Sequence, residues 1–310
     1  MYQPKHPSGY CPNLWSVYRK MLGKSRKSTF SRLLINTIRI LKIGQTMAYC
    51  VDIFTFKNSK EYEFKWAGNY GARGEKRAPK VKATPEQIKR QNQWKREKYS
   101  KRLMKLNFEK GDLWCTVLYP KGTRRPIDEV KDDMKKFLRK LRAKYKKRGD
   151  ELKFMYRIEI GARGGVHIHM ICNHSRGDPP IDMVIQAAWT EGRVHFERFG
   201  GNEEDYQRLA DYIVKAPNEE QEEKIREREE SEEDKKALIA YSTSRNLQRP
   251  VPERKKFKRR TVRKLIEDGP KPTPGYYIDN SSIVSGVNKY TGMSYLYYTE
   301  IKIDPGGGSG

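Results

Sequence analysis

Two histidines are spaced so that both side chains would lie on one face of a β-strand. His167 and His169 stand in the run VHIHMI, where imidazoles alternate with apolar residues. Residues two apart in a strand point to the same face, so the two rings should lie side by side. The alternate residues that should face the core are Val166, Ile168 and Met170. Because neutral imidazole is a common metal ligand, the spacing predicts a two-ligand metal platform; two histidines without a metal are the alternative.

A carboxylate on the preceding strand is a candidate third ligand. If the expected strand 153–160 pairs antiparallel with the histidine strand across the turn 161–165, Glu159 lies near the two imidazoles. Two imidazoles and one carboxylate, with open positions, suit Mn²⁺ or Mg²⁺ acting on phosphate oxygens, and they would also hold Zn²⁺ or Ni²⁺. His174 and His195 are further candidate ligands, although a lone histidine is more often an ordinary surface or core residue.

A tyrosine and a lysine one turn apart form the second constellation, in the run DYQRLADYIVKAP. At 100° per residue, the apolar helix face contains Tyr206, Leu209, Ala210 and Ile213. Tyr212 and Lys215 lie together on the other side, and Pro217 should end the helix just after them. A phenol with a pKa near 10 is a poor nucleophile unless positive charge favours the phenolate, and Lys215 is a candidate for that role. An ordinary surface pair is the alternative.

The elements that must position these residues predict an α+β fold. Strands are expected over 112–119, 153–160 and 166–172. An amphipathic helix over 128–147 is expected to pack on their sheet. Its apolar stripe contains Val130, Met134, Phe137, Leu138, Leu141 and Tyr145. The architecture is thus a central antiparallel sheet with flanking helices and with basic N- and C-terminal extensions.

The charge of the chain points to a polyanionic partner. The 310 residues include 65 Lys and Arg against 39 Asp and Glu, a formal net charge of +26. Nucleic acid is the expected partner, with an anionic membrane surface as the weaker alternative. A helix beginning at Thr84 and a basic segment over 254–264 are expected to contact the backbone of DNA. The candidate DNA-binding residues are Lys95, Arg96, Lys98, Arg102, Arg245, Lys255 and Lys256.

Composition also divides the chain into regions. We expect a basic arm over 1–46, a basic strand and helix region over 47–110, a nuclease core over 111–250 with an acidic insertion at 218–236, a basic segment with short terminal strands over 251–303, and a flexible tail over 304–310. The longest apolar stretch, 33–43, is too short and too polar to span a bilayer. The four cysteines are dispersed, which favours a reducing cytoplasm.

Several motifs together resemble the HUH endonuclease superfamily, specifically the rolling-circle replication initiator (Rep) proteins of bacterial plasmids, phages and mobile elements. They are LWCTVLY, HIHMI, WTEGRV and YIVK, in this order along the chain, and YSTSRNLQRP is also similar to a segment common in Rep proteins. The resemblance implies a Rep-like fold and a divalent metal held by His167, His169 and Glu159. It also implies that Tyr212 attacks a DNA phosphate, which gives a 5′-phosphotyrosine link and a free 3′-OH.

The resemblance further implies single-stranded or hairpin origin DNA as the substrate, and a bacterial cytoplasm as the location. No GxxxxGK[ST] motif occurs, so we expect a separate helicase and the host replication machinery as partners. No membrane and no small-molecule substrate are expected. Some relatives have a second tyrosine four residues after the first, but Ala216 stands there; Tyr206 and Tyr241 are the possible substitutes.

Rival functions stay open on the sequence alone. A transposase or a relaxase-like strand transferase would use the same chemistry, although conjugative relaxases have the tyrosine ahead of the histidines. A metal-dependent hydrolase would nick DNA without a covalent adduct. A non-catalytic basic nucleic-acid-binding protein, in which His167, His169 and Tyr212 are incidental, comes from a different class.

Overall fold

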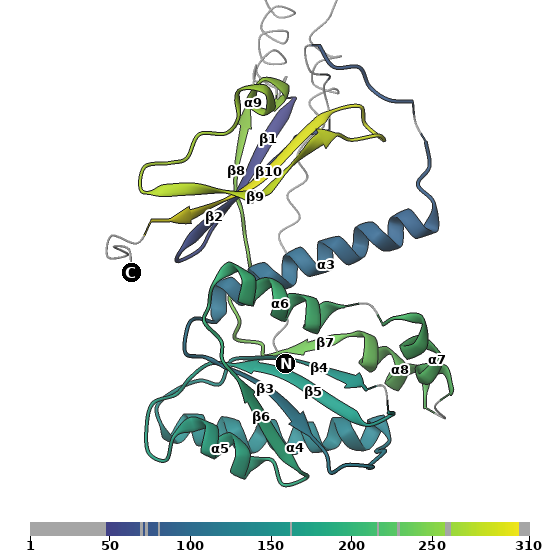
Figure 1. The fold of residues 1–310 in the computed structure, drawn as a ribbon, viewed down its shortest axis with the longest axis vertical. Coiled ribbons are helices and arrows are strands. Elements are labelled where there is room, and N and C mark those ends of the chain that lie inside the picture. The colour runs from purple at the N-terminus through teal and green to yellow at the C-terminus, as the bar shows by residue number, and fades with distance from the viewer. Residues whose placement is uncertain are drawn as a thin grey trace, which may run out of the picture.

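The computed structural model describes residues 48–68, 71, 74–79, 81–161, 163–215, 217–227, 230–257 and 262–303. Within them the chain forms two antiparallel five-stranded sheets with helices on their faces (Figure 1). The predicted α+β class is confirmed, and the fold is compatible with a Rep-like one. The predicted basic arm over 1–46 and the tail over 304–310 lie outside the described residues. No described helix is long and apolar enough to cross a membrane.

The first sheet, which we call the histidine sheet, contains both predicted histidines. Its strand order is β6-β3-β5-β4-β7, and every neighbouring pair is antiparallel. The strands are β3 (Leu113–Leu118), β4 (Phe154–Ile160), β5 (Val166–Cys172), β6 (Arg193–Glu197) and β7 (Tyr241–Thr243). The three strands expected from the sequence are therefore confirmed, and two short strands extend the sheet at its edges.

One face of the histidine sheet is covered by α4 (Ile127–Lys147) and α5 (Ile181–Ala188) (Figure 1). All six apolar residues of the predicted α4 stripe are buried. They pack in one core with Val166, Ile168 and Met170, the residues expected to alternate with the histidines. The alternation in VHIHMI thus separates a packed face from a face available for chemistry.

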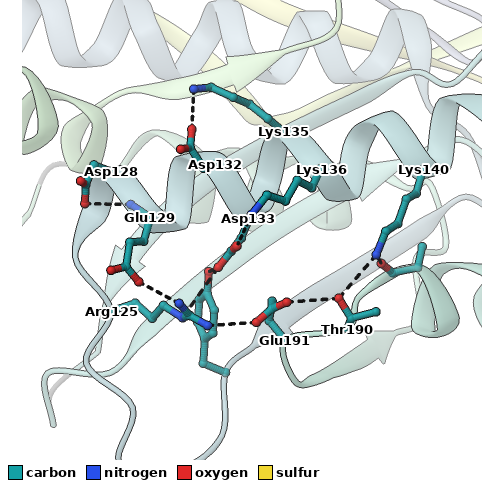
Figure 2. A network of polar contacts seen from close by, with 12 residues as sticks. Arg125, Asp128, Glu129, Asp132, Asp133, Lys135, Lys136, Lys140, Thr190 and Glu191 are labelled. Carbon is teal, nitrogen blue, oxygen red and sulfur yellow. Dashed lines mark hydrogen bonds and ion pairs between the residues drawn. The ribbon is translucent and has the colours of Figure 1, made fainter.

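A network of polar contacts fastens α4 to the ends of the neighbouring strands (Figure 2). Arg125, just before α4, contacts Glu129 and Asp133 of the helix and Glu191 of the loop before β6. The Tyr119 hydroxyl, just after β3, donates to the same Asp133 at 3.1 Å. The network therefore fixes the loop between β3 and α4 on the side of the sheet opposite the histidines.

The opposite face of the histidine sheet is covered in part by α6 (Glu203–Val214), with α3 (Pro85–Asn107) lying across α6 (Figure 1). Thr84 caps α3 with a complete capping box: its hydroxyl accepts from the Gln87 N–H, and the Gln87 side chain accepts from the Thr84 N–H. The four residues that we predicted for the apolar face of α6 are all buried, in a core with Trp114 and Ile171 of the sheet.

The acidic insertion forms two short helices, α7 (Glu219–Glu227) and α8 (Glu232–Ile239). Each contributes one buried aliphatic residue, Ile225 and Leu238 respectively, to the core beneath the histidine sheet. Both helices contact β4, so the insertion packs beside the predicted site.

The second sheet, which we call the outer sheet, is built from both ends of the described chain. Its order is β8-β1-β2-β10-β9, and α9 (Val262–Asp268) packs against it. The strands are β1 (Tyr49–Thr55), β2 (Ser59–Trp66), β8 (Glu253–Phe257), β9 (Tyr276–Val287) and β10 (Ser294–Lys302). Short strands were expected after residue 276, but β9 has 12 residues and β10 has 9. Part of the basic segment 254–264 forms β8, which pairs with β1.

Buried ion pairs join α3 to both neighbours. The Arg102 guanidinium contacts Glu61 at 2.7 Å and Glu63 at 2.5 Å, both on β2 of the outer sheet. Lys105 Nζ lies 3.0 Å from Glu61 and 2.6 Å from Glu203 at the start of α6, with only 2% of its side chain exposed. The cationic side of α3 therefore connects the outer sheet to the helix that carries Tyr212.

Candidate active site

The strand register brings the predicted metal ligands onto one face of the histidine sheet. Glu159 of β4 lies directly opposite His167 of β5, and Arg157 lies opposite His169. On the other side of β5, Thr116 of β3 lies opposite His169. Directly opposed residues in an antiparallel pair share a face, so these five side chains form a polar patch within the sheet.

Glu159 and His169 are in direct contact. One carboxylate oxygen, Oε2, lies 2.9 Å from His169 Nε2, and the other accepts a hydrogen bond from Gln221 of α7 at 2.9 Å. Thr116 Oγ1 lies 3.2 Å from the second ring nitrogen, Nδ1, of His169. The hydrogen bond with His169 lowers the pKa of Glu159 against the opposing effect of burial, so the carboxylate stays ionised.

The ring of His167 lies over the turn between β4 and β5. A Cβ added at Gly161 would come within 2.9 Å of His167 Cε1, whereas one at Gly165 would be 4.0 Å from Nε2. Burial and the neighbouring His169 lower the pKa of His167. The neutral form that can act as a ligand is thereby favoured.

The donor set suits a divalent cation by its chemistry. Two imidazoles and an ionised carboxylate on one face are the ligand types used for Mn²⁺ or Mg²⁺ near phosphate, and they also accept other divalent ions. Among the described residues, no three histidine, cysteine or carboxylate side chains already converge as a metal-binding group. Glu159 and His169 instead share a hydrogen bond through atoms that a metal would occupy.

The predicted nucleophile lies beside this patch. The rings of Tyr212 and His169 have centroids 5.4 Å apart, and Trp114 of β3 contacts the same tyrosine edge-on at 5.8 Å. Tyr212 is 47% exposed, although the residues around it on α6 are buried. The helix therefore holds the phenol next to the histidines while leaving it open to solvent.

Arg157 holds the C-terminal end of α6 from below. Its guanidinium donates to the carbonyl oxygens of Tyr212, at 3.5 Å, and of Lys215, and also to Leu238 O of α8 at 3.4 Å. Such carbonyls at a helix end lack partners within the helix, and a cation there also interacts favourably with the helix dipole. Burial lowers the pKa of Arg157. We did not single out this residue from the sequence, although it shares a strand face with Glu159.

Lys215 lies just beyond the helix, as its C-cap residue. Its side chain is exposed, and its contact with the site is through its carbonyl oxygen, which accepts from Arg157. The cation that approaches Tyr212 on α6 is Arg208, whose guanidinium carbon lies 4.6 Å from the centroid of the Trp114 ring. The signal for Arg208 was its spacing, four residues ahead of Tyr212.

The other candidate site residues have different surroundings. His195 lies opposite Thr116 on β6 and is exposed, two strands away from His169. The His174 backbone N–H donates to Asp112. Tyr206 is buried, with its hydroxyl donating to Phe108 O at 2.6 Å, and Tyr241 lies opposite Arg157.

The predicted DNA-binding residues divide into exposed and engaged groups. Arg102 is 7% exposed and is held by Glu61 and Glu63; Lys98 contacts Glu63 at 2.7 Å and lies over the rings of Trp94 and Tyr297. Their charges therefore also serve the packing of α3 on the outer sheet. The exposed members of the predicted set are Lys95, Arg245, Lys255 and Lys256, while Arg96 is half-buried and donates to Ile239 O.

Comparison with known families agrees with this geometry. Residues 112–217, which include β3 through α6, match the family model of the replication-associated protein ORF2. This segment belongs to a family of rolling-circle replication initiators. The predicted resemblance to Rep proteins is thus confirmed over the segment that contains Glu159, His167, His169 and Tyr212. Neither a comparison with curated proteins nor one with solved structures found a match.

Proposed function

We propose that the protein is a metal-dependent endonuclease that nicks and rejoins single-stranded origin DNA through a covalent link to Tyr212. The observation that supports this most strongly is the position of Tyr212, exposed and 5.4 Å from His169 between ring centroids, within a segment of the replication-initiator family. A phenol at a helix surface has no packing role there, whereas a nucleophile must be open to its substrate.

His167, His169 and Glu159 are the proposed holders of the cation, Mn²⁺ or Mg²⁺. When bound, it would polarise a phosphate oxygen and offset the negative charge that develops during attack. Thr116 and Gln221 orient His169 and Glu159 through their hydrogen bonds, as outer partners of ligands commonly do. Arg157 holds the end of α6 and so sets the position of Tyr212 relative to the histidines.

The proposed reaction exchanges one phosphodiester for another. Tyr212 Oη attacks the phosphorus and loses its proton to water, while the bond from phosphorus to the 3′ oxygen breaks and that oxygen takes up a proton. The products are a 5′-phosphotyrosine and a free 3′-OH that can prime synthesis. Attack by a 3′-OH on the phosphotyrosine later reverses the steps, so the bond energy is conserved without a nucleotide cofactor. Lys215 is the proposed cation near the phenol from the sequence pattern, acting from the exposed end of α6.

The proposed substrate is single-stranded or hairpin DNA at a replication origin. Exposed cations on α3 and β8, with Arg245 between them in the chain, would bind its backbone. A separate helicase would open the duplex, since the chain has no phosphate-binding GxxxxGK[ST] loop, and the host replication machinery of a bacterial cell would extend the 3′-OH.

The test is adduct formation on labelled single-stranded oligonucleotides that tile the origin of the protein's own genetic element. With Mn²⁺, we expect an adduct that survives denaturing electrophoresis and maps to Tyr212 by mass spectrometry. EDTA, Tyr212→Phe and His169→Ala should each abolish it. Nicking that survives Tyr212→Phe would instead indicate a hydrolase, and salt-sensitive binding without any nick would indicate a non-catalytic binder.

A transposase or relaxase-like strand transferase is the alternative with the same chemistry. The family match, which is to replication-associated proteins, favours initiation. Joining assays with origin and unrelated 3′-OH strands distinguish the two, because a replication initiator should rejoin its own nicked origin strand.

A further inference from the structure

Arg208 and Tyr212 lie on the same side of α6 and contact the same aromatic ring. They are four residues apart, which places their side chains one above the other on a helix. The Arg208 guanidinium carbon is 4.6 Å from the centroid of the Trp114 ring, and the Tyr212 ring centroid is 5.8 Å from it. Trp114 itself is 1% exposed, so it is a fixed support that holds both side chains.

The Arg208 guanidinium is open to a ligand. Half of its side chain, 51%, is exposed, and its polar contact is with Asp205 Oδ1 at 3.3 Å. Asp205 also accepts from the Gly200 N–H at 2.7 Å, so its other oxygen is committed to the start of α6. A guanidinium stacked on one face keeps its edge N–H groups available to an anion lying in the plane of the ring.

We propose that Arg208 binds the phosphate that Tyr212 attacks. This inference rests on the proposed function and deepens it, because it assigns a phosphate-binding residue to the site. The guanidinium would donate to the non-bridging oxygens of the phosphate from the side of α6, across from His167 and His169 on the sheet. The scissile phosphate is thereby placed between the helix and the histidines, within reach of the phenol.

The choice of Arg208 over Lys215 follows from the helix geometry. Lys215 is beyond the last helical residue, and its backbone turns away from the helix at that point. Arg208 is fixed by the helix and by Trp114, and it keeps its charge at any pH at which DNA is bound. A planar guanidinium also matches two phosphate oxygens at once, which a lysine ammonium does not.

The experiment measures which DNA phosphate Arg208 contacts, without relying on cleavage. The tightest-binding oligonucleotide of the tiled pool is made with single methylphosphonate substitutions, each of which removes one phosphate charge. Dissociation constants are measured in EDTA for the wild type and for Arg208→Ala. We expect one substituted position to weaken wild-type binding by about tenfold and Arg208→Ala binding by less than about twofold. That position should be the phosphate that becomes joined to Tyr212 when Mn²⁺ is added.

Two further variants isolate the effect. Arg139→Ala removes the same charge from α4, on the opposite face of the sheet, and should reproduce the wild-type profile at every position. Arg208→Lys keeps a charge without the planar fork and should restore part of the coupling to the same phosphate. Circular dichroism and thermal unfolding check that each variant is folded.

The outcomes separate this inference from the proposed function. A methylphosphonate profile of Arg208→Ala identical to the wild type would overturn the inference, even if Tyr212 still forms an adduct. Coupling to a phosphate other than the one joined to Tyr212 would also overturn it. If no adduct forms with Mn²⁺ but the coupling is present, the phosphate contact of Arg208 is supported and the proposed nicking activity fails.

Discussion

At the scale of single residues, the turn under His167 offers a precise test of the site. A methyl group at Gly161 would lie 2.9 Å from His167 Cε1, closer than carbon atoms approach, while one at Gly165 would be 4.0 Å from the same ring. The Gly161 backbone does not need a positive φ, so alanine should fit the chain itself. The imidazole rather than the turn must therefore move.

We expect Gly161→Ala to reduce adduct formation by about tenfold or more, with a change in unfolding free energy below about 1 kcal/mol. Single-turnover cleavage with Mn²⁺ and urea denaturation measure the two effects. Gly165→Ala is the matched control in the same turn and should cleave like the wild type. Equal cleavage by both alanine variants would argue against a role for the His167 ring.

Arg157 should matter for both stability and positioning. The carbonyl oxygens that it holds, of Tyr212, Lys215 and Leu238, belong to the ends of two helices. Arg157→Lys cannot reach all three, and we expect a loss of about 1.5–3 kcal/mol in unfolding free energy. If cleavage at saturating DNA falls further than DNA affinity does, Arg157 positions the nucleophile; equal losses in both would assign it a purely structural role.

At the scale of elements, α3 depends on buried charges whose partners lie on two neighbours. Lys105 has only 2% of its side chain exposed and contacts both Glu61 and Glu203. Lys105→Met would leave Glu61 with Arg102 as its remaining cation, and we expect a loss of about 3–5 kcal/mol. Lys101→Met removes a partly exposed contact to the same Glu203 and should cost less than about 1 kcal/mol. Chemical denaturation of both variants checks the difference.

The contact between β1 and β8 should make the outer sheet sensitive to acid. Arg254 and Lys65 lower the pKa of Asp52 to about 2, against burial, so this carboxylate stabilises the fold when ionised. A depressed pKa means that the stabilisation is present above the unfolded-state pKa of 3.8 and disappears as the pH falls towards about 2. The difference in unfolding free energy between the wild type and Asp52→Asn should therefore shrink between about pH 6 and about pH 2.5. A difference independent of pH would contradict this.

The same elements show what a sequence can and cannot predict. Periodicity predicted α4 and the hairpin of β4 and β5 because their patterns are local, and the hairpin alone brought Glu159 opposite His167. The pairing of β1 with β8 and of β2 with β10 was not predictable, because alternation indicates a strand but not its distant partner. Arg208 was missed because its role depends on Trp114, which reaches it only after β3 and α6 pack together.

At the scale of the whole molecule, the excess of 26 positive charges should make DNA binding strongly dependent on salt. Each phosphate contact to a single strand contributes a slope of about −0.7 in a plot of log affinity against log salt concentration. Replacing the exposed Lys95 and Lys256 together by glutamine should therefore reduce the slope by about 1.4 if both contact phosphates. Titrations at several salt concentrations measure it, with Lys135→Gln and Lys147→Gln on α4 as the matched control; an unchanged slope would exclude these two contacts.

The composition of the outer sheet has a consequence for how the protein is made. Phe64 of β2 pairs with Leu296 of β10, while every strand of the histidine sheet lies between them in the chain. Domains generally fold as they leave the ribosome, N-terminal parts first. The histidine sheet and α6 can thus assemble around Tyr212 during synthesis, while β1 and β2 wait with open edges for partners that are translated last. A ribosome that stalls after α8 would release a chain with its nucleophile in place and its α3 anchor incomplete.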